Sequence, residues 1–152
     1  MTKKKLEVSP EQMLSLYQNQ RALLDSIEQQ IQTAQAFLRE TTMAEDALKE
    51  ISESAKDKRV LFSVGAGVFI DTRLLDSKNV KAEIGGGAFK EMTIKKAMNR
   101  LDDRKEDIRK GLKKLAEREE KALASLKQME SAMAKFQQQL QQREKQVPSG
   151  VS

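Results

Sequence analysis

The sequence predicts a mostly α-helical protein of the α+β class, in which a long antiparallel two-helix coiled coil is joined by two central β-hairpins. Two observations carry this prediction. Apolar residues recur at helical spacing on both sides of the centre, and the glycine-rich centre has the alternating pattern of strands. The centre also repeats itself at a separation of 20 residues, with VGAGVF at Val64–Phe69 and IGGGAF at Ile84–Phe89.

The composition favours an interaction protein over an enzyme. The 152 residues are 38% hydrophobic, 4% aromatic and 34% charged, which suits long amphipathic helices with one buried seam. There is no cysteine and no histidine, so a thiol nucleophile, a thiolate metal site and the usual general base are excluded. We therefore expect no catalytic residues, no cofactor and no metal site.

The net charge is +5, and the excess lies in residues 93–152, which hold 15 basic and 9 acidic residues. No apolar run approaches the ~18–20 residues of a membrane span. The lysines near the N-terminus are not followed by the apolar run of a secretory signal. We expect a soluble, cytoplasmic protein.

A first helix is expected over residues 9–56. Ser9 can cap it, Pro10 suits the first helical position, and Gln12 stands where a capping box requires it. Without a breaker in residues 11–54, the helix has roughly 45 residues and a length of ~65 Å. Two seam rows contain Met13, Ile27, Ala34 and Leu48, and Tyr17, Leu24, Ile31 and Leu38. A flanking row, expected to widen the apolar stripe, contains Leu16, Leu23, Phe37, Ala44 and Ile51.

Residues 60–92 predict the two hairpins, with glycine clusters that supply the positive φ angles of tight turns. The glycines do not form a nucleotide-binding fingerprint, because Gly65 and Gly67 lack the third glycine and no Gly-Lys-Ser/Thr follows. Isolated hairpins are marginal in water and expose unpaired edges. We expect these to pair with other chains, the alternative being that they fold back onto the base of the helices. The residues expected in the oligomerisation interface are Val60, Phe62, Val64, Val68, Phe69, Ile70, Val80, Ile84, Ala88 and Phe89.

A second helix is expected over residues 93–146, capped by Thr93 and followed by a tail at 147–152. Its heptads predict a left-handed coiled coil, interrupted by Lys105 and Glu119. The seam positions are Ile94, Met98, Leu101, Ile108, Leu112, Leu115, Ala122, Leu126, Met129, Met133, Phe136 and Leu140. The short connection makes the helices antiparallel neighbours, so Met13 faces the Phe136–Leu140 region and both chain ends lie at one tip.

The basic residues of the second helix raise a rival interpretation, a coiled-coil arm that binds nucleic acid. Acidic residues interleave with them, and Glu106–Lys110 and Glu117–Lys121 have the spacing of ion pairs within a helix. This neutralised pattern favours a solvated helix face. A purely structural coiled-coil dimer is a third alternative.

With these elements in this order, the chain resembles a prefoldin subunit. The resemblance rests on Val64–Ile70, Ile84–Lys90 and the helix start Thr93–Leu101, and the presence of two hairpins is similar to the α class. It implies that residues 1–152 form a single prefoldin-like unit. It further implies a hexamer of two α and four β subunits, in which the hairpins form an inter-subunit β-barrel platform that carries six coiled coils.

The resemblance also implies a function. Prefoldins are ATP-independent chaperones, or holdases, that bind unfolded proteins at the coiled-coil tips and deliver them to a group II chaperonin. By position along the helices, the residues of this chain at the client-binding tip are Val8, Met13, Leu14, Met133, Phe136, Leu140 and Val147.

Overall fold

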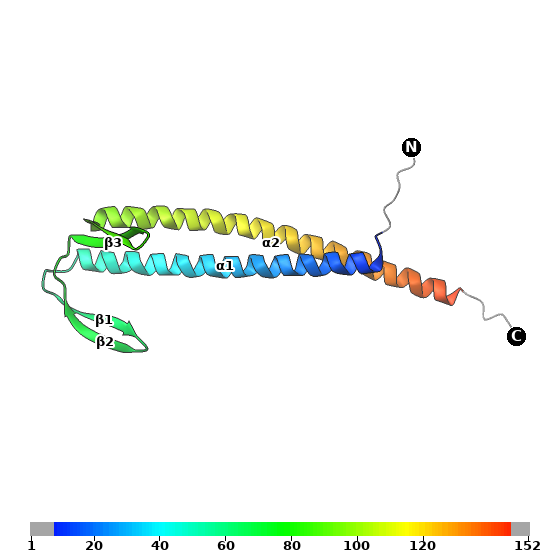
Figure 1. Ribbon diagram of the computed structural model, residues 1–152, viewed down its shortest axis with the longest axis horizontal. Helices are drawn as coiled ribbons and strands as arrows, with labels where there is room; N and C mark the ends of the chain where they lie inside the picture. Colours follow the sequence, from blue (N-terminus) through cyan, green and yellow to red (C-terminus); the bar gives the residue numbers. More distant parts are fainter. Residues whose placement is uncertain (1–7, 147–152) are drawn as a thin grey trace, which may run out of the picture. The chain divides into compact units, whose positions relative to one another are not determined.

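The computed structural model describes residues 8–146. It contains two long helices separated by two antiparallel hairpins (Figure 1). Helix α1 spans Pro10–Ser52 and helix α2 spans Ile94–Lys145. Hairpin 1 consists of β1 (Arg59–Gly65) and β2 (Val68–Arg73), and hairpin 2 consists of β3 (Asn79–Gly85) and β4 (Ala88–Thr93). The predicted mostly helical fold with two hairpins is confirmed.

Both helices contribute residues to each of two compact units. The hairpin unit is Ala34–Gly111, and it holds both hairpins with the adjoining parts of the helices. The helix-end unit contains the described residues of Met1–Thr33 and Leu112–Ser152.

The helix starts follow the predicted capping chemistry. The Ser9 backbone N–H donates to Gln12 Oε1 at 3.0 Å, and the Gln12 N–H donates to Ser9 Oγ at 3.2 Å, which together form a capping box. At α2 the Lys96 N–H donates to Thr93 Oγ1 at 3.2 Å. These side chains satisfy backbone groups that a helix start would otherwise leave unpaired.

Helix α1 ends at Ser52, four residues before the expected end of the helix at 56. Asp57 has a left-handed φ of 64°, which an α-helix does not accommodate. Its N–H donates to the Leu74 carbonyl at 2.8 Å, and the Leu74 N–H donates to the Lys58 carbonyl at 2.9 Å. The chain at 57–58 therefore continues the ladder of hairpin 1 rather than the helix.

The seam of the helix-end unit is antiparallel and follows the predicted heptads. Leu24 and Ile27 of α1 bury against Ala122 and Leu126 of α2, with Tyr17, Ile31 and Leu115 packed around them. The Tyr17 hydroxyl donates to Glu130 Oε1 at 2.8 Å across the helices, and this bond is the main reason that the pKa of Tyr17 is raised. Truncating a buried leucine in such a seam costs about 2–5 kcal/mol.

In the hairpin unit, the polar interruption at Lys105 has a partner. Lys105 Nζ forms an ion pair with Glu45 Oε2 of α1, and the two side chains are only 16% and 12% exposed. Asp102 Oδ1 lies 3.6 Å from the same ammonium group. The hydrogen bond to Glu45 is the main cause of the raised pKa of Lys105. The seam thus replaces an apolar contact with a charged pair at this layer.

The flanking row of α1 does not widen the buried stripe as expected. Leu16, Leu23 and Phe37 are exposed, and only Ala44 and Ile51 are partly covered. A two-stranded seam buries the two inner rows of each helix, so a third row stays at its border unless another element covers it.

The two hairpins are built alike. In hairpin 1 Arg59 pairs with Arg73 and Gly65 with Val68, and in hairpin 2 Asn79 pairs with Thr93 and Gly85 with Ala88. Each has its register shift just before the turn. The central turn residues have positive φ in both, 50° and 76° at Ala66 and Gly67, and 60° and 77° at Gly86 and Gly87, as in type I′ turns.

Candidate interaction surfaces on the hairpins and helix ends

Hairpin 1 exposes apolar side chains on both of its faces. Val60, Phe62 and Ile70 share one face with Thr72, while Leu61 and Phe69 lie on the other. The six large apolar residues Leu61, Phe62, Val64, Val68, Phe69 and Ile70 are between 46% and 66% exposed. Only Val60 among the expected interface residues of this hairpin is half-buried. Within residues 8–146, β1 and β2 pair only with each other.

The base of hairpin 1 is charged where its tip is apolar. Arg59 Nε donates to Asp71 Oδ1 at 2.9 Å and Arg59 Nη2 donates to Asp71 Oδ2 at 2.6 Å. This bidentate pair raises the pKa of Arg59. Both side chains are more than half exposed, so the pair adds little stability by itself. The base of hairpin 1 is therefore charged and exposed to solvent, whereas its outer half is apolar.

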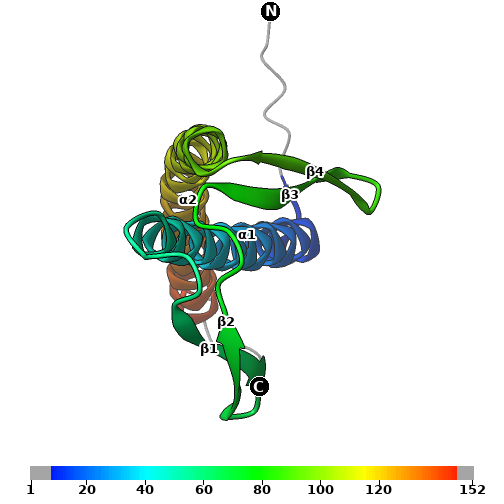
Figure 2. The ribbon, with the colours of Figure 1, turned by 90° about the vertical axis from the view of Figure 1, so that its left-hand side faces the viewer.

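Hairpin 2 has one face partly covered by its own chain. Met92 is 6% exposed, and Val80 and Ala82 are half-buried. Nearer the turn this face is no longer covered, and Ile84, Ala88 and Phe89 are exposed. The hairpins leave the bases of the helices in different directions (Figure 2). Of the two alternatives for the hairpins, folding back onto the base of the helices therefore applies in part to hairpin 2, and it does not apply to hairpin 1.

A hydrogen-bonded turn sets the start of hairpin 2. Asp76 Oδ1 accepts the N–H of Lys78 at 2.7 Å and that of Asn79 at 3.2 Å, and Asp76 Oδ2 accepts from Asn79 Nδ2 at 3.0 Å. The bond from Lys78 is the main reason that the pKa of Asp76 is lowered. The Ile94 N–H then donates to the Lys78 carbonyl at 2.9 Å, so the turn and the start of α2 are held together.

The helix ends expose four of the residues predicted at the client-binding tip. Val8, Leu14, Phe136 and Leu140 are between 36% and 47% exposed. Met13 and Met133 are half-buried in the seam instead, and Val147 lies outside the described residues. Figure 1 shows the last turns of α2 continuing past the start of α1. Phe136 and Leu140 hold seam positions of α2 and are nevertheless exposed.

Three further apolar residues of the helix-end unit are exposed and were not assigned to the tip: Leu16, Leu23 and Leu123. The heptad spacing of Leu16 and Leu23 marks them as a row beside the seam, whereas no pattern in the sequence singles out Leu123.

The basic face of α2 forms one of its two predicted ion pairs. Lys110 Nζ lies 2.9 Å from Glu106 Oε1, and both side chains are exposed. No ion pair joins Glu117 and Lys121 among the described residues. In residues 8–146 no group of three or more acidic, histidine or cysteine residues could hold a metal ion. No helix in this part of the chain has the length and apolar character to cross a membrane.

Comparison with known families and curated proteins gives a consistent match. The family model described as "Prefoldin subunit" matches residues 20–139. "Prefoldin subunit alpha" of Methanopyrus kandleri is 31% identical over 74 residues, covering 49% of this chain and 47% of that protein. That of Thermofilum pendens is 28% identical over 100 residues, 66% of this chain and 78% of that protein. That of Picrophilus torridus is 25% identical over 101 residues, 66% of this chain and 71% of that protein.

Solved structures match as well. Filamentous PFD from Methanocaldococcus jannaschii has a TM-score of 0.65 at 15% identity, covering 80% of this chain and 98% of that chain. The prefoldin β subunit from Thermococcus strain KS-1 has a TM-score of 0.54 at 22% identity, covering 86% and 95%. At these identities the two structures support the fold alone. The first curated match spans about half the length of its relative.

Proposed function

The chain belongs to the prefoldin family of chaperones and to its α class, and we propose that it acts as the α subunit of an ATP-independent holdase. In this role it binds unfolded proteins at the ends of its helices and delivers them to a group II chaperonin. The observation that carries the proposal is the presence of two uncovered apolar surfaces, on the hairpins and at the helix ends, beside a well-packed seam.

We propose that the hairpin surface is an assembly surface. Burying a large apolar side chain contributes about 1.5–3 kcal/mol, so covering the six exposed residues of hairpin 1 is a strong driving force. Its free strand edges supply main-chain hydrogen bonds to a partner. The partners proposed are prefoldin β subunits, in a hexamer of two α and four β subunits held together by an inter-subunit β-barrel. Residues 1–152 then act as a single prefoldin-like unit of a cytoplasmic assembly.

The helix ends are proposed as the client-binding surface. Val8, Leu14, Phe136 and Leu140 offer a small apolar area on each subunit, which fits weak binding to many sequences. Several such ends in one assembly bind one unfolded chain together, so avidity replaces a single tight pocket. We propose no catalytic step, because holding a client needs reversible apolar contact only.

A matched pair of variants tests the client surface. The tip variant replaces Val8, Leu14, Phe136 and Leu140 with serine, and the control replaces the exposed Met43 and Leu75 of the hairpin unit with serine. Suppression of aggregation of a heat-unfolded client is measured by light scattering, with the assembly checked by sedimentation. We expect the tip variant to lose most of its suppression and the control to keep it. Full suppression by an intact tip-variant assembly would contradict the assignment.

A further inference from the structure

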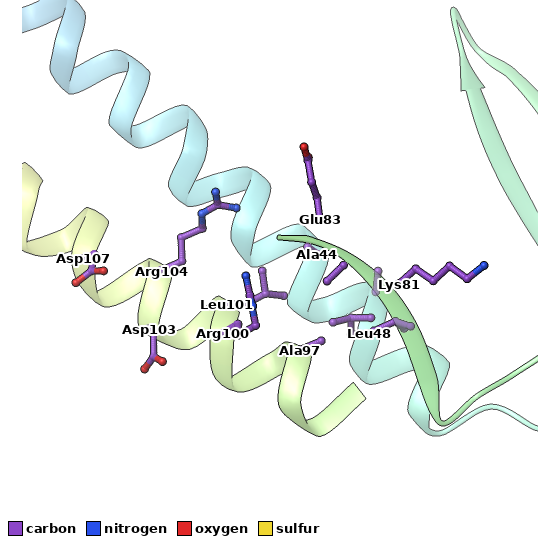
Figure 3. A pocket seen from close by; sticks show the side chains of 13 residues that line it. Ala44, Leu48, Lys81, Glu83, Ala97, Arg100, Leu101, Asp103, Arg104 and Asp107 are labelled. Carbon is purple, nitrogen blue, oxygen red and sulfur yellow. The ribbon is translucent and has the colours of Figure 1, made fainter. Parts of the chain in front are cut away.

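In the hairpin unit, strand β3 borders one side of the seam between the helices (Figure 3). The cavity between β3 and the helices has a volume of about 710 Å³, and its lining includes Ala44 of α1 with Ala97 and Arg104 of α2. Each of these three residues immediately precedes a seam position of its helix, at 45, 98 or 105. Residues that precede the seam on α1 and residues that precede it on α2 therefore lie on the same side of the antiparallel pair.

The same rule places two exposed leucines of the helix-end unit on the side that carries Arg118. Leu16 and Leu23 immediately precede seam residues of α1, and their side chains are 51% and 43% exposed. Arg118 immediately precedes the seam position 119 of α2. Residues three and four positions from Arg118 share its face of the helix, which adds Lys114 and Lys121. With Lys135, two heptads beyond Lys121, these residues form the cationic side: Leu16, Leu23, Lys114, Arg118, Lys121 and Lys135.

The two sides of the helix-end unit differ in charge. Among the described residues, the cationic side holds four basic residues and no acidic residue. Its basic side chains are exposed, and none of the ion pairs of residues 8–146 includes them. The opposite side mixes both charges and holds Arg21, Lys113, Lys127, Glu11, Asp25, Glu28, Glu120, Glu130 and Glu144. Because like charges one helical turn apart repel each other, the cationic side favours a partner that brings negative charge.

We propose, on the basis of the holdase function proposed above, that the cationic side binds client segments in which carboxylates stand beside apolar side chains. The carboxylates bind the basic row of α2, and the apolar side chains of the client pack on Leu16 and Leu23. The chain thus holds acidic unfolded segments more tightly than neutral ones. None of the residues expected in the oligomerisation interface lies in the helix-end unit, so the proposed assembly leaves this side open.

The composition of the cationic side favours a polypeptide over a nucleic acid as its partner. A nucleic acid would bring negative charge but would leave the two leucines without apolar contacts. Single-stranded nucleic acids also stack their bases on aromatic side chains, and the described residues of this side include none. An acidic segment of an unfolded protein supplies both the charge and the apolar groups.

Two fluorescein-labelled peptides of equal length serve as probes, one with the repeat leucine-aspartate-glycine-aspartate and one with asparagine in place of each aspartate. Their binding to the full-length chain assembled with a prefoldin β subunit is followed by fluorescence anisotropy at physiological ionic strength. We expect the aspartate probe to bind about tenfold more tightly, because exposed ion pairs are weak singly but several act together here. Equal binding of the two probes would overturn the proposal and leave the holdase function standing. Binding of neither probe, with no suppression of client aggregation, would contradict both.

A matched pair of variants locates the preference for acidic probes. The cationic-side variant removes one arginine and two lysines, by Lys114→Gln, Arg118→Gln and Lys121→Gln. The control removes the same residue types from the opposite side, by Arg21→Gln, Lys113→Gln and Lys127→Gln. We expect the first variant to bind both probes equally to within about twofold and the control to keep the preference of about tenfold. A preference that survives in the first variant, or that is lost equally in both, would overturn the assignment to this side.

Two further measurements separate the apolar contact and the rival partner. Leu16→Ser with Leu23→Ser should weaken both probes several-fold and keep their ratio, because both probes carry the same leucines. Unchanged binding of both probes would contradict the apolar part of the site. A mixed-sequence RNA of the same charge, added as a competitor, should displace the aspartate probe less well than the unlabelled peptide does. Displacement at a lower RNA concentration would overturn the proposal in favour of nucleic acid.

Discussion

Hairpin 1 and hairpin 2 have equivalent strand pairing, the same register shift before the turn and the same turn geometry, yet only hairpin 2 contains a buried side chain. The difference lies in residues at equivalent positions. Met92 of hairpin 2 is buried where hairpin 1 has Thr72, and Ala82 stands where hairpin 1 has Phe62. One face of hairpin 2 is partly covered within its own chain, whereas hairpin 1 leaves its large apolar residues exposed. The residues that determine the turn and the strand pairing of a hairpin are thus different from those that determine whether its face is covered.

We expect the largest effect, a loss of assembly, from substitutions that remove apolar side chains from the surface of hairpin 1. Phe62→Ser with Ile70→Ser removes two exposed apolar side chains from one face, and we expect assembly with β subunits to be lost. The helical content of the isolated chain should not change, because neither residue is buried in it. Sedimentation measures the assembly and circular dichroism the helices. Met43→Ser with Leu75→Ser is the control, and an assembly as stable as that of the control would show that hairpin 1 is not the contact.

At the buried position of hairpin 2, Met92, a substitution is expected to lower the stability of the isolated chain itself. Met92→Ala should lower the free energy of unfolding of the isolated chain by about 2–5 kcal/mol, because it leaves a cavity. The equivalent change Thr72→Ala removes a hydroxyl that donates to the Val60 carbonyl at 2.9 Å and should cost about 1 kcal/mol. Chemical denaturation compares the two. Equal losses of unfolding free energy in the two variants would contradict the conclusion that only hairpin 2 contributes a buried side chain.

The turns offer a smaller contrast. Ala66 has a left-handed φ of 50°, where hairpin 2 has Gly86 at 60°. We expect Ala66→Gly to stabilise hairpin 1 by about 0.5–1 kcal/mol, since glycine relieves the strain but adds freedom to the unfolded chain. Gly86→Ala should destabilise hairpin 2 by a similar amount. Hydrogen exchange of the strand amides reports each hairpin by itself, and a loss of protection in Ala66→Gly would contradict the prediction.

The smallest effect concerns the turn between the hairpins and its dependence on pH. The pKa of Asp76 is lowered from its ordinary value of 3.8, mainly by the Lys78 N–H, so the ionised form stabilises the fold. This contribution is present above pH 3.8 and is lost as the pH falls through the lower pKa of the folded state. Asp76→Asn should therefore have a flatter acid-unfolding curve. An unchanged curve would show that the turn does not titrate in this range.

Much of the fold could be predicted from the sequence because its signals are local. Ser9 and Gln12 lie within one turn of the helix that they cap, and Gly86–Gly87 determines its turn without help from elsewhere. The pairing of Lys105 with Glu45 could not be predicted so directly, because it depends on how the helices align. The exposure of Phe37 escaped prediction for a related reason, since heptad spacing does not show whether a third row has a neighbour.

The candidate surfaces, too, could be predicted from the sequence only in part. Position along the helices identified Leu14, Phe136 and Leu140 as end residues, and the structure leaves them exposed. It did not separate them from Met13 and Met133, which are half-buried, because position along a helix does not show how far a neighbouring helix covers a side chain. Which hairpin has a buried side chain could not be predicted from spacing either: Met92, Ile94 and Ala97 are all buried, and they lie where β4 of hairpin 2 leads into α2.

The most direct test of the proposed role is the mass of the particle that this chain forms with a prefoldin β subunit. Analytical ultracentrifugation of the chain alone, of the β subunit alone and of their mixture gives these masses. We expect a new species in the mixture, with the mass of two α and four β chains, and we expect the variant Phe62→Ser with Ile70→Ser to lose it. A mixture that sediments as the sum of its separate components would contradict the assembly and, with it, the proposed function.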